Sequence, residues 1–218
     1  MITTLSPILI EASYVLNESA TDTTAKRISY GNRAIRRVLR MRKWNWAKKS
    51  HTMSTLVAGT QEYDLSSAIT DFNPMWGIYE VYIGGEKVGP IDYNQKDNTT
   101  GTHCYLKPDG VTIGFTNDID GTEDIVIWYS SRWTNVAADT TTFSLSIPED
   151  MLGAIVLLIK AMVHGAKRQR YDERNALLDF KEEIEELVLQ DATNKFKDLP
   201  INIPTPITYN RVVRNYTY

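Results

Sequence analysis

Residues 25–50 of this 218-residue chain read AKRISYGNRAIRRVLRMRKWNWAKKS. The segment holds ten of the 24 Lys and Arg residues, and all 27 Asp and Glu residues lie outside it. The net charge is only −3, but positive and negative charges are strongly separated along the sequence. A basic segment of this kind predicts an anionic partner, which is either nucleic acid or the acidic surface of another protein or of another copy.

The apolar residues of the segment recur with the period of an amphipathic helix. At 100° per residue, Ile28, Ile35, Val38 and Leu39 share one stripe. The basic residues of the broadly opposite face are Lys26, Arg33, Arg36, Arg37, Arg40 and Lys43. We expect the stripe to pack on the protein and the basic face to contact a partner. The alternative is a solvated face, but no acidic residue at helical spacing compensates the run.

The hydrophobic period changes twice along the chain. Residues 5–43 have helical spacing and predict two helices. Residues 51–143 contain short β-branched and aromatic runs between turn residues, which predicts strands and hairpins. The expected hairpins join 52–57 with 61–65, 76–83 with 87–88, and 103–107 with 111–115, and 125–129 is expected as a central strand.

The helical period returns at Ser146. Ser146, Pro148 and Glu149 fit a capping box at the start of a helix that is expected to reach about Arg170. A further helix follows, with Leu177, Phe180, Ile184, Leu187 and Val188 on one face. Its other side carries Asp179, Glu182, Glu183, Glu185 and Glu186. This acidic face is the electrostatic counterpart of the basic helix.

The last residues, 199–218, differ from the rest of the chain. They contain three prolines, no acidic residue and no helical period. A disordered tail is one interpretation. The apolar content favours an extended segment that becomes ordered on a neighbour. The residues expected to dock are Ile201, Ile203, Ile207, Tyr209, Val212, Val213 and Tyr216.

These patterns predict an α+β fold. Residues 1–50 and 146–198 are expected to form an antiparallel helical bundle, with 51–145 inserted as a β-rich module. Residues 199–218 are expected to form an extended C-terminal docking tail. The hydrophobic content of 42% and charged content of 23% are ordinary for a globular protein.

No pattern of catalytic residues is present in the sequence. The single Cys104 excludes an intrachain disulfide, and His51, His103 and His164 fall in three predicted elements without metal-ligand spacing. There is no P-loop, G-x-S-x-G or dinucleotide-binding glycine motif. The most apolar run, 151–163, is too short to span a bilayer. We therefore expect a protein that is not an enzyme, with no cofactor and no metal.

The order of elements and several short passages resemble a known family. The passages are Trp44-Asn45-Trp46, then Ala58-Gly59-Thr60-Gln61-Glu62-Tyr63-Asp64-Leu65, and Pro148-Glu149-Asp150 at the start of a helix. With the closing helix pair, they resemble the head–tail connector (adaptor) proteins of tailed bacteriophages, including the tail tubular ring proteins of short-tailed phages. The resemblance covers nearly the whole chain.

The resemblance implies a structural virion protein, assembled in the host cytoplasm and located in the neck or tail of the phage. It implies a dodecameric ring beneath the portal, with DNA passing through its centre. The implied partners are other copies, the portal, a downstream tail or nozzle protein, and tail fibres, with DNA only in transit. The family's C-terminal segment reaches the portal, which here corresponds to 199–218. The residues expected at the subunit interface are Arg33, Arg36, Arg37, Arg40, Glu182, Glu183 and Glu186.

Two other classes of function are compatible with parts of the sequence. One is a nucleic-acid-binding protein that uses the basic helix, 24–43. Against it, the basic run continues beyond the helix, and the rest of the chain is acidic. The other is a carbohydrate-binding or enzymatic tail component, which the aromatic residues of the β-rich region favour. We expect Trp44 and Trp46 instead to anchor the basic helix to that region.

Overall fold

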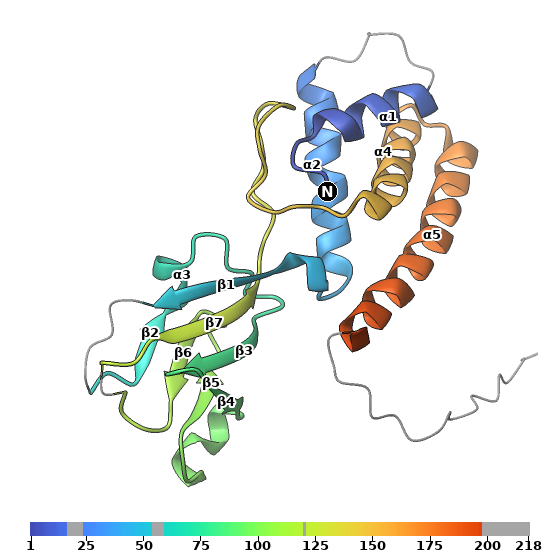
Figure 1. Ribbon diagram of the computed structural model, residues 1–218. Helices are drawn as coiled ribbons and strands as arrows, with labels where there is room; N and C mark the ends of the chain where they lie inside the picture. Colours follow the sequence, from blue (N-terminus) through green and yellow to red (C-terminus); the bar gives the residue numbers. More distant parts are fainter. Residues whose placement is uncertain (17–23, 54–58, 120, 198–218) are drawn as a thin grey trace, which may run out of the picture.

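The computed structural model describes residues 1–16, 24–53, 59–119 and 121–197 (Figure 1). The α-helices are α1 (Ser6–Leu16), α2 (Thr24–Met41), α3 (Leu65–Ala68), α4 (Leu152–Ala166) and α5 (Arg170–Lys197). The 3-10 helices are η1 (Asn45–Ala47), η2 (Tyr93–Asn98) and η3 (Glu149–Met151). The strands are β1 (Lys48–Met53), β2 (Glu62–Asp64), β3 (Ile78–Ile83), β4 (Glu86–Pro90), β5 (His103–Leu106), β6 (Thr112–Phe115) and β7 (Ile125–Ser130).

The strands form one curved, seven-stranded half-barrel in the order β1-β7-β3-β4-β5-β6-β2 (Figure 1). The sheet is mixed, because β4 and β5 pair in parallel while the other pairs are antiparallel. Ile113, Phe115, Ile125 and Ile127 are fully buried in its own hydrophobic core. The alternating burial along β7 follows from its apolar side chains and its two neighbouring strands.

Two of the three predicted hairpins are confirmed, and the predicted central strand is the interior strand β7. In the β3–β4 hairpin the turn residues Gly84 and Gly85 both have positive φ, as a two-residue turn requires. The hairpin between 52–57 and 61–65 is wrong. β1 pairs with β7 and β2 pairs with β6, at opposite edges of the sheet. The backbone N–H of Gly59 donates to the Ile119 carbonyl, so this turn bonds to a different segment.

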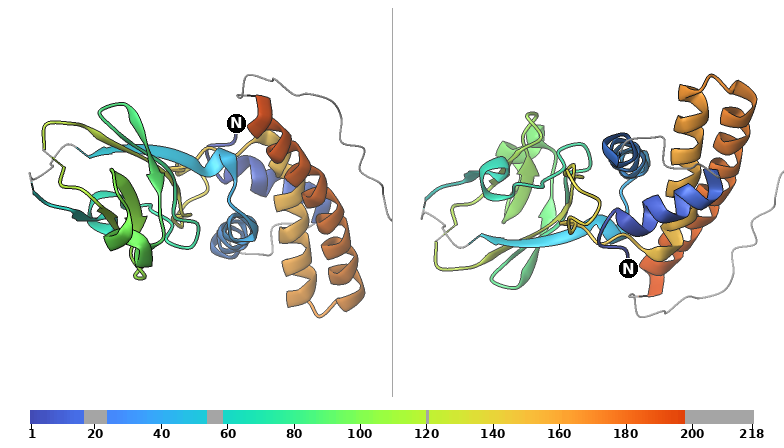
Figure 2. Two further views of the ribbon diagram at one scale, coloured as in Figure 1. Left: turned by 90° about the horizontal axis from the view of Figure 1, so that it is seen from below. Right: turned by 90° about the horizontal axis from the view of Figure 1, so that it is seen from above.

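The helices have a second hydrophobic core, which α4 dominates. Most of α4 is buried, including Ile155, Leu158 and Ile159, and α4 packs against α1, α2 and α5. Two views of the molecule show α4 between α2 and α5 (Figure 2). A helix that is apolar on nearly all sides needs neighbours on several sides, and this need determines the helical layer.

The α+β class is confirmed, but the predicted antiparallel helical bundle is wrong. The largest organised element is the half-barrel sheet, and only a few helices accompany it. Of the longer helices, α4 and α5 form an antiparallel pair, whereas α1 crosses the ends of α2 and α4 (Figure 1). The sequence pattern indicated an apolar face on each helix but could not indicate that three helices share α4 as their common neighbour.

The predicted capping box at Ser146 is also wrong. Residues 149–151 form η3, α4 begins at Leu152, and the Glu149 carboxylate pairs with the amino group of Met1. The carboxylate at the start of α4 comes from Glu183 of α5, which accepts a hydrogen bond from the Ala154 backbone N–H. Gly153 makes this possible, since a Cβ there would lie 2.0 Å from Oε1 of Glu183.

The helices and the sheet are joined around the end of α2. Trp44 is buried in the helical core, and its Nε1–H donates to the Val38 carbonyl at 2.8 Å. Trp44 and Trp46 therefore pack mainly within the helical part, not against the sheet as expected. The joining hydrogen bonds come from the sheet side: Trp76 Nε1–H donates to the Leu39 carbonyl and the Tyr79 hydroxyl donates to the Trp44 carbonyl.

Candidate functional site

The candidate site is the basic face predicted from the sequence. The basic residues at its C-terminal end form hydrogen bonds and ion pairs with other residues of the same chain. Arg42, after the end of α2, donates to the Val188 carbonyl at 3.0 Å and forms an ion pair with Asp191 at 3.3 Å. Its guanidinium also lies over the Trp44 ring, 5.1 Å from the ring centre. Arg42 therefore ties the end of α2 to the distal half of α5.

Lys43 connects the same region to β3, and Lys48 links β1 to β3 within the sheet. Lys43 donates to the Ile78 carbonyl at 2.7 Å and lies over the Tyr79 ring. Lys48 forms an ion pair with Glu80 at 3.0 Å. Hydrogen bonds from Lys87 and Lys48 lower the pKa of Glu80 to about 2. Glu80 is thus held in its charged form between two lysines.

Lys49 completes this engaged set through Asp71. The Asp71 carboxylate accepts hydrogen bonds from Lys49 at 2.5 Å, the Tyr129 hydroxyl at 2.7 Å and the Ser131 hydroxyl at 2.9 Å. Burial opposes ionisation here, but the hydrogen bonds from Lys49, Tyr129 and Ser131 lower the pKa of Asp71. This cluster fixes the loop before β3 to strands β1 and β7.

The part of the basic face that lies on α2 itself behaves differently. Arg33, Arg37 and Arg40 are exposed, and none makes an ion pair with a residue in the described ranges. Arg36 is half-buried and donates a hydrogen bond to the Asn135 side chain. Ile28, Ile35, Val38 and Leu39 are buried as predicted, so the arginines point away from the helical core.

Arg36 and Arg40 also line an open hollow of about 730 Å³ between α2 and the sheet. Arg132 contributes a third guanidinium to its wall, and its guanidinium donates to the Thr70 carbonyl at 2.9 Å. The other lining residues are Leu39, Asn73, Met75, Trp133, Thr134 and Asn135. The hollow is therefore positively charged, with both apolar and amide groups around it.

Asn32 fixes the outer wall of this hollow, and it was missed from the sequence. Asn32 is 5% exposed, and its amide donates to the Ile28 and Val136 carbonyls, both at 3.0 Å. Its side-chain oxygen accepts from Trp133 Nε1–H at 2.9 Å and from the Val136 N–H at 3.0 Å. All four hydrogen-bonding positions are used. The available signal was a polar residue on the apolar side of the helix.

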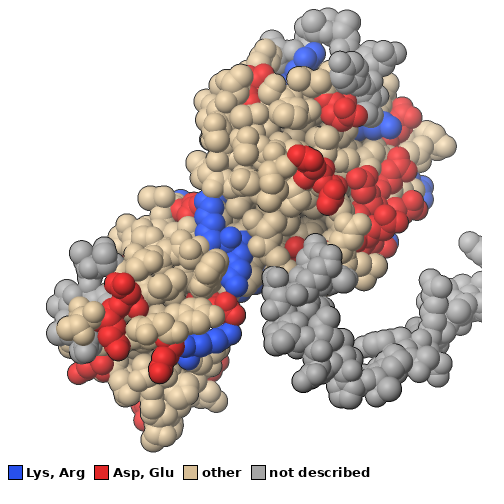
Figure 3. Space-filling model, in the orientation of Figure 1, with Lys and Arg blue, Asp and Glu red and all other residues tan. Residues whose placement is uncertain are grey.

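The acidic face predicted for α5 is present. Phe180, Ile184 and Leu187 are buried against the helical core. Acidic side chains gather over α5 on the surface of the molecule (Figure 3). The exposed residues of the predicted acidic face are Asp179, Glu182, Glu185 and Glu186. Of these, Glu185 lies 3.9 Å from Lys181, and the others make no ion pair within the described part of the chain.

Glu183 is the exception among these acids, because it faces its own chain. It is half-buried at the start of α4, where its carboxylate accepts from the Ala154 N–H. Burial raises its pKa, that hydrogen bond acts in the opposite direction, and the neighbouring Glu186 charge raises it further. A carboxylate at a helix N-terminus is favourable, so Glu183 stabilises the α4–α5 pair.

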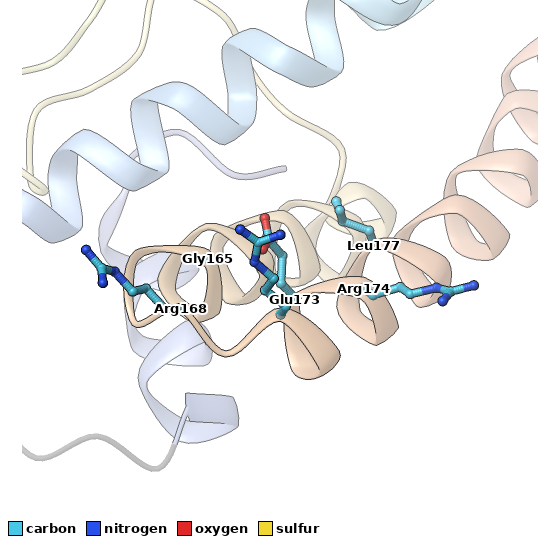
Figure 4. A pocket seen from close by; sticks show the side chains of 6 residues that line it. Gly165, Arg168, Glu173, Arg174 and Leu177 are labelled. Atoms are coloured by element: carbon cyan, nitrogen blue, oxygen red, sulfur yellow. The ribbon is translucent and has the colours of Figure 1, made fainter.

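A second hollow, of about 700 Å³, lies at the turn between α4 and α5 (Figure 4). It is lined by Gly165, Arg168, Arg170, Glu173, Arg174 and Leu177. Arg168 and Arg174 point in opposite directions, and the Glu173 carboxylate packs against Gly165 (Figure 4). These arginines do not converge on one point, so the hollow does not form a defined anion site.

The structure also places the residues that could have carried other chemistry. The residues His51, His103 and His164 lie in β1, β5 and α4, and the described residues contain no group of three His, Cys, Asp or Glu side chains that could hold a metal ion. Burial raises the pKa of the Cys104 thiol to about 11, which disfavours the nucleophilic thiolate. No helix within the described ranges is both long and apolar enough for a membrane span.

The structure does not place the residues that were predicted to dock on the portal. They are Ile201, Ile203, Ile207, Tyr209, Val212, Val213 and Tyr216, and all lie outside the described residues.

Some of the aromatic residues of the sheet region have a structural role. Trp133 is buried against Phe143, with ring centres 4.7 Å apart, and Trp76 bonds to α2.

The described residues form a half-barrel sheet joined to helices that carry a basic outer face on α2 and an acidic outer face on α5. A family model described as SU10 adaptor protein matches residues 3–202, and the chain belongs to this family. It is therefore a bacteriophage adaptor protein, a virion component that interacts with other capsid or tail proteins. No curated protein shows significant similarity to the sequence.

Proposed function

We propose that the protein forms a homo-oligomeric ring that joins the portal to the tail and leaves a central channel for DNA. The observation that carries this proposal is the placement of two unpaired charged faces. The exposed arginines lie on α2, the exposed acids lie on α5, and α4 lies between the two helices (Figure 2). The dodecameric state follows from the resemblance to head–tail connectors, as does assembly in the host cytoplasm.

A ring of identical copies needs two different, complementary surfaces on each copy. Among the residues expected at the interface, Arg33, Arg37 and Arg40 of one copy would face Glu182 and Glu186 of the next, while Arg36 and Glu183 also have contacts in their own chain. Each copy would then present its basic face on one side and its acidic face on the other, and the contact repeats until the ring closes. Residues 1–50 and 146–198 would build this ring, while 51–145 would extend from it as a separate domain.

The C-terminal residues 199–218 would dock on the portal. Their Ile, Val and Tyr side chains provide apolar area that a lone extended segment cannot bury on itself. The docking set is Ile201, Ile203, Ile207, Tyr209, Val212, Val213 and Tyr216. A downstream tail or nozzle protein, and tail fibres, would bind the opposite side of the ring. DNA would pass only in transit, because each phosphate that the protein neutralises adds affinity and slows sliding.

The proposal is tested by mass measurement of the purified protein, alone and mixed with portal. Changing Arg36, Arg37 and Arg40 together to Glu should block ring formation without unfolding the subunit. Reversal of the facing acids to Arg should restore part of the assembly. The matched control reverses three basic residues at the α4–α5 turn: Lys167, Arg168 and Arg170. Normal rings from the first triple variant would refute the proposed interface.

A nucleic-acid-binding role is the second candidate, and the hollow with Arg36, Arg40 and Arg132 favours it. Three guanidinium groups on one wall could hold phosphates. The engaged residues Arg42 and Lys43 argue against it, since their charges are used inside the chain. A mobility shift with duplex DNA at physiological salt decides between the roles, and tight binding that the Arg40→Glu change abolishes would favour the second.

A further inference from the structure

The exposed charges of the two outer helices form two stripes of equal length. The arginine stripe consists of Arg33, Arg37 and Arg40, at spacings of four and three residues. The acidic stripe consists of Asp179, Glu182 and Glu186, at spacings of three and four residues. Each stripe therefore covers about 10.5 Å along its helix, at about 1.5 Å per residue. Equal length allows all three charges of one stripe to meet the other stripe.

Two neighbouring charges do not belong to these stripes, because each has a contact in its own chain. Arg36 donates to the Asn135 side chain. Glu183 accepts from the Ala154 N–H at the start of α4. Asp179, which the sequence pattern did not single out as an interface residue, is exposed and joins the acidic stripe instead.

The helices that carry the stripes run in the same direction within one copy. The segment directly after α2 contacts the C-terminal part of α5, since the Asn45 side chain donates to the Asp191 carbonyl at 3.0 Å and Arg42 pairs with Asp191. Both helices run from the far end of the molecule toward the sheet (Figure 1). In a ring whose axis is parallel to these helices, the rotation that relates one copy to the next leaves the direction of each helix unchanged. A contact between α2 of one copy and α5 of the next is then parallel.

We propose that adjacent copies pair in a parallel register: Arg33 with Asp179, Arg37 with Glu182, and Arg40 with Glu186. This register rests on the proposed ring and specifies the contact within it. At 100° per residue, Arg37 and Glu182 each lie to one edge of their stripe, and a parallel contact brings these edges together. An antiparallel contact would separate them. The axial mismatch of the central pair is only about 1.5 Å, well within the reach of an Arg side chain.

An apolar pair supports the same register independently of charge. Met41 lies one residue after Arg40 on α2 and is 46% exposed. Leu189 lies three residues after Glu186 on α5 and is 68% exposed. In the parallel register both lie on the same edge of the contact, about two residues apart along the helices. A large exposed apolar side chain at each position is what an interface would cover. The antiparallel register would place them at opposite ends.

Charge swaps at the ends of the stripes test the register. Arg33→Glu alone should weaken association about tenfold, which corresponds to about 1.4 kcal/mol. Arg33→Glu with Asp179→Arg should restore the association constant to within about threefold of the original, because the pair is re-formed with reversed sign. Arg33→Glu with Glu186→Arg has the same net charge and should remain weak. Arg170→Glu, at the start of α5 and outside both stripes, is the control for a general charge effect.

The association constant is measured by light scattering at low and at high salt, with the circular dichroism of each variant as the test of folding. Rescue by Glu186→Arg instead of Asp179→Arg would overturn the parallel register while the ring proposal stands. Equal behaviour of Arg33→Glu and the unchanged protein would overturn any role of the stripe. A failure of the unchanged protein to assemble, alone or on portal, would refute the proposed function itself.

Discussion

The two halves of the basic segment are both rich in Lys and Arg and free of acidic residues, but their side chains have different surroundings. From Arg42 onward, each of Arg42, Lys43, Lys48 and Lys49 has a partner in its own chain. On α2 itself, Arg33, Arg37 and Arg40 have no ion pair within the described residues. Arg42 and Lys43 connect the end of α2 to α5 and to β3, whereas Lys48 and Lys49 form ion pairs inside the sheet region. The arginines of α2 are those that we propose to meet another copy.

This difference shows that local charge density does not determine what a basic residue does. Arg42 and Arg40 are two residues apart, yet only Arg42 lies near the end of α5 and its Asp191. A paired charge adds to folding stability, whereas an exposed unpaired charge contributes little to it. Substitutions should therefore separate the two halves: stability changes for the engaged residues, and assembly changes for the arginine stripe.

The largest effect is expected at the Asp71 cluster. Asp71→Ala removes the partner of Lys49 and two further hydrogen bonds, and it leaves the lysine charge half-buried and uncompensated. We expect a loss of about 3 kcal/mol in the free energy of unfolding. Denaturant unfolding measures this loss. The control Asp97→Ala, at an exposed position of η2, should change stability by less than about 0.5 kcal/mol.

Arg42→Ala should have the next largest effect. It removes the ion pair with Asp191, the hydrogen bond to Val188 and the contact with the Trp44 ring. We expect a loss of about 2 kcal/mol. Thermal and denaturant unfolding of the variant should agree on this value. A loss no larger than that of Arg37→Ala would remove the distinction between the two halves of the segment.

Glu80→Gln should have a smaller effect that depends on pH. The pKa of Glu80 is lowered from 4.5 to about 2. Its charged form therefore stabilises the folded state fully at pH values above 4.5. This contribution is lost as the pH falls from 4.5 toward 2. We expect Glu80→Gln to cost about 1 kcal/mol at pH 7 and almost nothing near pH 2. The comparison requires unfolding curves at several pH values, and a cost that is constant with pH would contradict it.

Arg37→Ala should have the smallest effect on stability. Its side chain is exposed and makes no ion pair among the described residues, so the free energy of unfolding should change by less than about 0.5 kcal/mol. The same change should reduce association between copies. If Arg37→Ala instead destabilised the subunit as much as Arg42→Ala, the arginine stripe would have to be an internal structural element.

The sequence was sufficient wherever structure depends on neighbouring residues. The apolar stripe of α2, the apolar and acidic sides of α5, and the hairpins with Gly84-Gly85 and Asp109-Gly110 depend on residues a few positions apart. The pairing of β1 with β7 is not local, because the paired residues lie about 80 positions apart, as in Lys49 with Tyr129. The turn at 58–60 suggested a hairpin that this pairing replaces.

The candidate site shows the same limit. The helical period identified both charged faces, but it could not show which charged side chains form contacts within their own chain. Whether Arg42 or Glu183 is free depends on contacts with Asp191 and Ala154 in other elements. Three of the four hydrogen bonds of Asn32 likewise reach residues about 100 positions away. Only the polar residue within an apolar stripe was visible beforehand.

The most direct measurement is cross-linking between α2 and α5 of different copies. A variant with Arg37→Cys and Glu182→Cys is assembled and treated with a short bismaleimide reagent. The native Cys104 is buried, and burial raises its pKa to about 11, so it should react slowly. Because α4 lies between α2 and α5 within one copy, the diagnostic products are those with the mass of two or more copies. We predict a ladder of linked copies from the assembled protein, and none from a control with Arg37→Cys and Arg170→Cys. An assembled protein that yields only unlinked chains would contradict the proposed contact.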